Sequence, residues 1–219
     1  MKKIALALVA AGLSTAAAAG PQDYNYLEGG VSIGFGEAND ETKTLSVEGN
    51  QRMGNIFFDG ALSYIDADGD KGFALGFAGG LALDIAGGEV AVAAGGIHLE
   101  PDEGDSSTYP VVSARYTLAG ENNRYYDLEY THILVDDEDG EDENALVLSV
   151  EGGDRNTWRY EASFTRFIEE EINGIGVDFI FPLTPQDSGE FVLGATKAWA
   201  DDSNADSYTL QFGYRLNLD

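Results

Sequence analysis

Charged residues set among alternating apolar residues are the part of this sequence that could do chemistry. Carboxylates and arginines gathered on one face of a sheet either pair into a buried salt-bridged network or line a wet passage. We expect the network first, and the surplus of carboxylates would make an open passage favour cations. The residues predicted to share this face are Glu48, Arg52, Asp59, Arg115, Asp127, Glu129, Glu151, Arg159, Glu161, Asp178 and Arg215.

The two histidines, His98 and His132, are the candidates for acid–base catalysis. A histidine beside a hydroxyl and a carboxylate can activate a nucleophile, and Ser106-Ser107 and Asp136-Asp137 lie near in the sequence. Neither histidine stands in a recognisable catalytic motif, and His132 shares its parity with apolar residues. The sequence therefore predicts no catalytic residue, with a hydrolase that uses either histidine as an alternative.

An acidic break, Asp66-Ala67-Asp68-Gly69-Asp70, resembles the start of a calcium-binding loop. Lys71 stands where that loop has glycine, and Phe77 stands where it has its bidentate glutamate. A tight turn explains the Asp and Gly residues equally well. We therefore predict no metal site and no cofactor, and leave open whether the acidic breaks bind divalent cations weakly.

The residues above must be positioned by strands, because hydrophobicity alternates with a period of two along the chain. In the last stretch, Ser207 to Asp219, one parity is aromatic or aliphatic and the other is polar. Side chains alternate between the faces of a strand, so this segment has one apolar and one polar face. Such a strand is expected where lipid lies on one side and water on the other.

Twelve segments of about ten residues follow this pattern after the N-terminal region, which is the length that a tilted strand needs to cross a bilayer. An even number suits a single-chain barrel. The prediction is an all-β fold, a transmembrane antiparallel up-and-down β-barrel of about 12 strands, with 10 as the alternative. The segment Val90 to Leu99 changes parity, for which we expect a bulge near Gly95-Gly96.

The turns and the outward aromatic residues indicate where the two ends of this barrel lie and how the ends differ. Breaks such as Pro101 to Ser107 and Asp136 to Glu143 are acidic, and they alternate with shorter or less charged turns. Outward aromatic residues fall near both ends of the strands, as two interfacial girdles would. Three cations of the apolar parity, Lys43, Arg166 and Lys197, fall near the acidic end. We expect them to contact the phosphates of lipopolysaccharide, or alternatively only to extend their charges into water.

The N-terminus has the features of a cleaved secretory signal. Lys2 and Lys3 precede an apolar run, and Ala17-Ala18-Ala19 fits a small-x-small cleavage site. The predicted domains are residues 1–19, a signal peptide, and residues 20–219, the barrel. The formal net charge of −27 argues against binding nucleic acid, and the absence of cysteine excludes disulfides.

Two short stretches resemble a known family. Tyr24-Asn25-Tyr26-Leu27-Glu28-Gly29-Gly30, continued by Gly60-Ala61-Leu62-Ser63-Tyr64, is similar to small outer-membrane barrel proteins once named for activating plant immunity. These are in turn similar to the opacity-type and porin-like small barrels. The resemblance implies an outer-membrane barrel without an established enzymatic role. The chain differs at its end, where Leu218 holds the last outward position in place of an aromatic residue.

Together these patterns predict a non-enzymatic barrel of a Gram-negative outer membrane, with a structural or surface role or a narrow cation-favouring channel. The alternatives are an outer-membrane rim hydrolase that uses His98 or His132, and a soluble periplasmic β-sandwich. The predicted partners are outer membrane lipid, lipopolysaccharide and the barrel-insertion machinery. The sequence predicts no oligomeric state.

Overall fold

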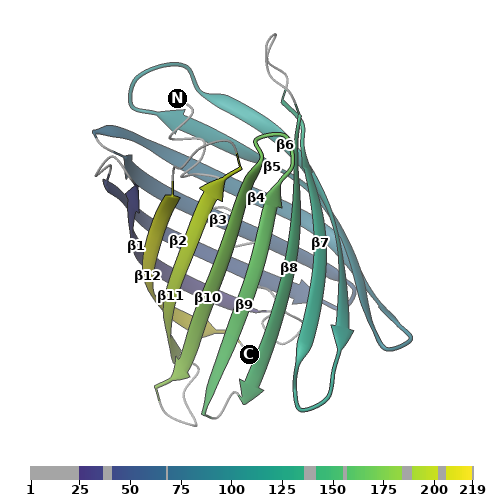
Figure 1. The fold of residues 1–219 in the computed structure, drawn as a ribbon. Helices are drawn as coiled ribbons and strands as arrows, with labels where there is room; N and C mark the ends of the chain where they lie inside the picture. Colours follow the sequence, from purple (N-terminus) through teal and green to yellow (C-terminus); the bar gives the residue numbers. More distant parts are fainter. Residues whose placement is uncertain are drawn as a thin grey trace.

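Twelve antiparallel strands form one closed barrel in the computed structural model (Figure 1). The structure describes residues 25–36, 41–67, 69–135, 142–154, 157–183, 189–201 and 206–218. The predicted signal peptide lies outside these residues. The strands are β1 (Tyr26–Gly36), β2 (Glu41–Met53), β3 (Ile56–Ala67), β4 (Asp70–Ile85), β5 (Gly88–Pro101), β6 (Ser107–Ala119), β7 (Tyr125–Ile133), β8 (Glu143–Asp154), β9 (Trp158–Phe167), β10 (Ile172–Pro182), β11 (Gly189–Ala200) and β12 (Asp206–Asn217).

The barrel closes between the first and the last strand. Strand β1 pairs with β12 from Tyr26 opposite Asn217 to Gly36 opposite Ser207, and every other pair joins strands that are consecutive in the chain. Closure leaves no strand with unpaired backbone groups along an edge. The prediction of a 12-stranded barrel is confirmed, and the alternatives of ten strands and of a two-sheet sandwich are wrong.

Large apolar side chains cover the outer surface, because alternate residues of each strand point outward. Phe77, Leu210 and Leu45 are 62%, 60% and 57% exposed. Their sequence neighbours on the inner face are small or polar, and many of these are buried. A continuous apolar exterior around a polar interior is the reverse of a water-soluble protein and matches a barrel in lipid.

Outward aromatic residues gather near both ends of the barrel, as predicted. Near one end, Phe191 contacts Tyr214 with ring centroids 5.9 Å apart. Near the other end, the rings of Tyr64 and Phe73 are 5.1 Å apart. Aromatic side chains with polar tips are favoured at the two interfaces of a membrane.

The predicted bulge near Gly95-Gly96 is wrong. The pairing of β4 with β5 runs without interruption from Gly72 opposite Pro101 to Ile85 opposite Gly88. Ile97 and Leu99 therefore point inward. The parity change that suggested a bulge instead reflects an inner wall that becomes apolar at that level.

Several strands are longer than predicted, because they continue into segments that were expected to be turns. Strand β5 begins at Gly88 instead of Val90, and β11 begins at Gly189 instead of Phe191. These extra residues matter because they place Glu89 and Glu190 on the inner face. No helix in the described part of the chain is long and apolar enough to cross a membrane.

Candidate functional site

The two ends of the barrel are named here by their connections. At the turn end the described chain starts with Asn25 and finishes with Leu218, and the loop end carries the connections that the sequence makes acidic. Most inward-facing charge lies in the turn half of the lumen, the half next to the turn end. These residues are the buried or half-buried carboxylates Glu28, Glu48, Asp59, Glu89, Asp127, Glu129, Glu151, Glu161, Asp178 and Glu190, the exposed Asp84, and the arginines Arg52, Arg115, Arg159 and Arg215.

Arg215 is the centre of a first group of contacts. Its Nε donates to Glu28 Oε2 at 2.8 Å, and its guanidinium lies 4.5 Å from the centre of the Tyr26 ring. The Tyr26 hydroxyl donates to Glu48 Oε1 at 3.4 Å. Arg215 is 2% exposed, so its charge is stabilised by the neighbouring carboxylates and the ring rather than by bulk water.

Two inward-facing glycines make room for the carboxylates of this first group. A Cβ added at Gly213 would lie 2.5 Å from Glu28 Oε1, and one added at Gly194 would overlap Asp178 Oδ1. Gly213 lies on β12, the strand that carries Arg215, and Gly194 lies on the neighbouring strand β11. Their missing side chains let two carboxylates lie flat against the barrel wall.

Arg159 forms a second group with two glutamates from other strands. It donates to Glu151 Oε1 at 3.1 Å and to Glu190 Oε2 at 2.8 Å. Arg159 is 1% exposed, and both carboxylates are buried. One guanidinium therefore ties β8, β9 and β11 together across the inside of the wall.

A third group lies on the opposite side of the lumen. Arg52 forms an ion pair with Glu89, and Arg115 approaches the other oxygen of the same carboxylate at 4.0 Å. Next to it, Thr117 donates to Asp127, and Thr131 donates to Glu129 at 3.2 Å. The acids of this group also outnumber its arginines.

Two cavities adjoin these groups. A cavity of about 10 Å³, enough for about one water molecule, lies in the wall of the turn half. Its lining is Glu28, Glu48, Glu161, Asp178, Ile180, Val192, Gln211 and Arg215. A more open pocket of about 290 Å³ lies at the turn end, lined by Asp84, Gly88, Glu89, Thr117, Ala119 and Tyr125.

The loop half of the lumen is almost free of charge along the strands, and it has two unlike walls. From β10 through β11, β12 and β1 to β2 the inward residues are mostly small or carry hydroxyl groups, for example Thr196, Thr209 and Thr44. From β5 to β9 they are mainly aliphatic or aromatic. That apolar wall consists of Ile97, Leu99, Tyr109, Val111, Ile133, Val147 and Phe167.

All eleven charged residues predicted to share the inner face do so in the structure, because the parity of their strands was read correctly. The sequence reading missed Glu28, Glu89 and Glu190, which are the direct partners of Arg215, Arg52 and Arg159. Glu28 was recoverable from parity, because its neighbour Leu27 faces outward. The other two lie between a predicted turn and the predicted first residue of the next strand.

The three predicted outward cations lie at the loop end, and each contacts an acid. Lys43 Nζ is 3.3 Å from Glu41, Lys197 Nζ is 2.7 Å from Asp206, and Arg166 is 3.0 Å from Asp201. Lys197 also lies over the rings of Trp199 and Tyr208. A phosphate at this rim would meet cations that already have carboxylate partners, so it would have to share them. Contact with lipopolysaccharide stays a prediction.

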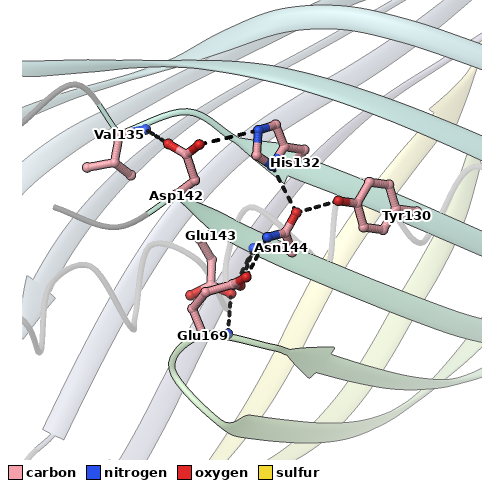
Figure 2. A network of polar contacts seen from close by, with 7 residues as sticks. All are labelled: Tyr130, His132, Val135, Asp142, Glu143, Asn144 and Glu169. Atoms are coloured by element: carbon pink, nitrogen blue, oxygen red, sulfur yellow. Dashed lines mark hydrogen bonds and ion pairs between the residues drawn. The ribbon is translucent and has the colours of Figure 1, made fainter.

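His132 belongs to a polar network at the loop end (Figure 2). Its Nδ1 is 2.8 Å from Asn144 Oδ1, and its Nε2 is 3.6 Å from Asp142 Oδ2. The Tyr130 hydroxyl also donates to Asn144. No hydroxyl or thiol is among the described side chains that contact this ring. His98 is likewise held by one neighbour, with Nδ1 2.8 Å from Thr108 Oγ1.

The same network joins two connections of the loop end. The Asn144 backbone N–H donates to Glu169 Oε2 at 2.7 Å, and the Asn144 amide donates to the other oxygen. Desolvation raises the pKa of Glu169, but the hydrogen bonds from Asn144 outweigh it, so this pKa lies below its ordinary value. The Glu169 carboxylate therefore stays ionised and holds the start of β8 against the β9–β10 turn.

Solved structures share this fold at low sequence identity. A KdgM porin in complex with disordered oligogalacturonate matches with a TM-score of 0.62 and 6% identity over 89% of this chain and 99% of that chain. An outer membrane channel from Pseudomonas putida F1 matches with 0.63 and 9% over 88% and 95%, and a NanC porin with 0.60 and 9% over 87% and 100%. No protein-family model and no curated protein matches the sequence. The resemblance to small outer-membrane barrels is thus confirmed as a statement about fold.

Proposed function

We propose that this chain is an outer-membrane β-barrel that forms a narrow channel with a preference for cations. The observation that carries the proposal is the composition of the lumen, where ten buried or half-buried carboxylates accompany four arginines in one half of the barrel. A passage lined by excess negative charge attracts cations and repels anions.

The apolar exterior supports the membrane location. Exposed aliphatic and aromatic residues cover the outward face of every strand, and aromatic rings gather near both ends. Export by the predicted signal peptide at residues 1–19, with assembly by the barrel-insertion machinery and contact with lipopolysaccharide through Lys43, Arg166 and Lys197, belongs to the same proposal. The loop end then faces the outside of the cell.

The channel role also draws support from the named activities of the neighbours, two porins and one channel. The oligogalacturonate named for the KdgM porin is a polyanion. The lumen of this chain would repel such a solute, so we do not extend that substrate to it.

The alternative of a rim hydrolase receives less support. Asn144 orients the His132 ring as the third member of a triad would, but the described contacts of that ring include no nucleophilic hydroxyl. His98 contacts the Thr108 hydroxyl, but the described contacts of its ring include no carboxylate. We therefore propose a non-enzymatic role.

Planar lipid bilayers test the channel directly. The purified barrel should produce conductance steps in KCl, and under a KCl gradient the reversal potential should shift toward the value for K⁺. A variant with Glu48→Gln, Glu161→Gln and Asp178→Asn should lose most of this shift. A folded, membrane-inserted protein that gives no conductance, or one that selects Cl⁻, would contradict the proposal.

A further inference from the structure

The lumen combines an apolar wall, a hydroxyl-bearing wall and a carboxylate-rich half, and an inorganic cation would not use the apolar wall. We propose that the solute of this channel is a small organic cation with an apolar body, such as an aromatic amine. This inference rests on the proposed channel function and specifies its substrate class.

The apolar wall of the loop half is the first part of the argument. The register places Ile97 opposite Tyr109 and Val111 opposite Ile133, so their side chains share the inner face at neighbouring positions. Ile97, Tyr109 and Val111 are half-buried, so part of each side chain faces the lumen, whereas Val147 and Phe167 on β8 and β9 are buried in the same wall. Apolar side chains on the inside of a barrel that already has lipid outside contribute nothing to membrane insertion. They can, however, bind the apolar part of a solute.

The opposite wall of the loop half keeps the passage wet. Ser32 lies opposite Thr44, and Thr196 lies opposite Thr209. Hydroxyl groups can replace part of the hydration of a polar group that passes along them. A solute with one apolar and one polar side would match both walls at the same level of the barrel.

The turn half supplies the charge complement. Glu28, Glu48, Glu161 and Asp178 line one cavity together with a single arginine. Beyond it, the pocket of about 290 Å³ at the turn end combines the carboxylates of Asp84 and Glu89 with the side chain of Tyr125. Carboxylates attract an ammonium group, and an aromatic face stabilises it further.

Other solute classes match only part of this surface. A hydrated metal ion gains nothing from the apolar wall, and a neutral hydrocarbon gains nothing from the carboxylates. An aromatic carboxylate would fit the apolar wall and then be repelled in the turn half. Only a cation with an apolar body uses all three regions.

Benzylammonium is the probe, measured as a blocker of K⁺ current in planar bilayers from the loop side. Methylammonium lacks the apolar body, and benzyl alcohol lacks the charge. Benzylammonium should reduce the K⁺ current at about tenfold lower concentration than either comparator, which corresponds to about 1.4 kcal/mol. It should also carry current itself under a gradient of its own salt.

A matched pair of double variants locates the effect. Ile97→Thr with Val111→Thr converts the half-buried part of the apolar wall to hydroxyls while retaining β-branched residues, and should abolish most of the tenfold preference. Val92→Thr with Val112→Thr makes the same kind of change on the outward face of the same two strands and should leave the preference nearly unchanged. Slower migration after boiling verifies that each variant folds.

Two results would overturn the inference, and they differ. A cation-selective K⁺ current that benzylammonium, methylammonium and benzyl alcohol reduce at equal concentrations overturns the substrate class and leaves the channel. A folded, inserted barrel with no K⁺ current overturns the channel and this inference together.

Discussion

The two halves of the lumen are built by the same twelve strands, yet they differ in chemistry. In the turn half, Arg215 and Arg159 are almost fully buried among carboxylates. In the loop half, the same strands carry hydroxyl, glycine and aliphatic residues. A β-barrel wall fixes which residues face inward but not what those residues are. The contrast therefore reflects side-chain chemistry rather than a change of fold.

The cations of the lumen and those of the loop-end rim also differ in burial. The lumen uses arginines, which can bind two carboxylates at once, as Arg159 does with Glu151 and Glu190. The outer rim at the loop end carries Lys43, Arg166 and Lys197, each in an ion pair that is at least partly exposed. Burial determines how much each ion pair contributes to the free energy of unfolding, and unfolding measurements on variants can compare these contributions.

The largest expected effect is at Arg215. Arg215→Met should lower the free energy of unfolding by about 3–5 kcal/mol, because it leaves Glu28 buried without the guanidinium that it contacts. Urea unfolding in lipid vesicles, followed by tryptophan fluorescence, measures the loss. Adding Glu28→Gln should recover part of it, and a single variant within 1 kcal/mol of the parent would refute the buried network.

Alanine substitutions at two inward glycines should differ in their cost to the free energy of unfolding, by less than the effect at Arg215. Gly213→Ala places a Cβ 2.5 Å from a Glu28 oxygen, so it should cost about 1–3 kcal/mol through overpacking. Gly174→Ala, in the loop half, meets nothing closer than 3.8 Å and should be neutral or slightly stabilising. The same unfolding assay compares them. Equal costs would show that the two halves are packed alike.

The smallest effect is expected at the rim. Lys197→Gln removes an ion pair with Asp206 whose two side chains are 35% and 33% exposed. Such an exposed pair contributes little to the free energy of unfolding, and its contribution falls with added salt. Unfolding at low and high NaCl checks both statements. A loss comparable to that of the Arg215 variant would contradict the distinction between rim and lumen.

Strand parity explains how much of this molecule could be predicted from the sequence. Alternation identified all twelve strands, the closing pair and the inward direction of residues such as Arg115 and Asp178. Lipid outside and water inside impose a period of two that is independent of tertiary detail. The fold was therefore accessible to local reasoning.

Side-chain contacts between strands were harder to predict from the sequence. Glu89 and Glu190 lie where β5 and β11 begin earlier than predicted, and turn composition does not show where pairing ends. Ile97 and Leu99 break the expected pattern because their lumen wall is apolar, which suggested a bulge that is absent. The partner of each arginine depends on register, which was not predicted.

Charge-dependent labelling tests the division of the lumen most directly. The natural chain has no cysteine, so Gln211→Cys, beside the carboxylate-lined cavity, and Thr196→Cys, in the loop half, provide single reporters. Rates with cationic and anionic methanethiosulfonate reagents are compared at about 0.15 M salt, where exposed charges act over about 8 Å. Relative to a free thiol, the cationic reagent should be favoured about tenfold at position 211 and little at position 196. Equal ratios at both positions, or a preference for the anion at position 211, would contradict a negatively charged turn half.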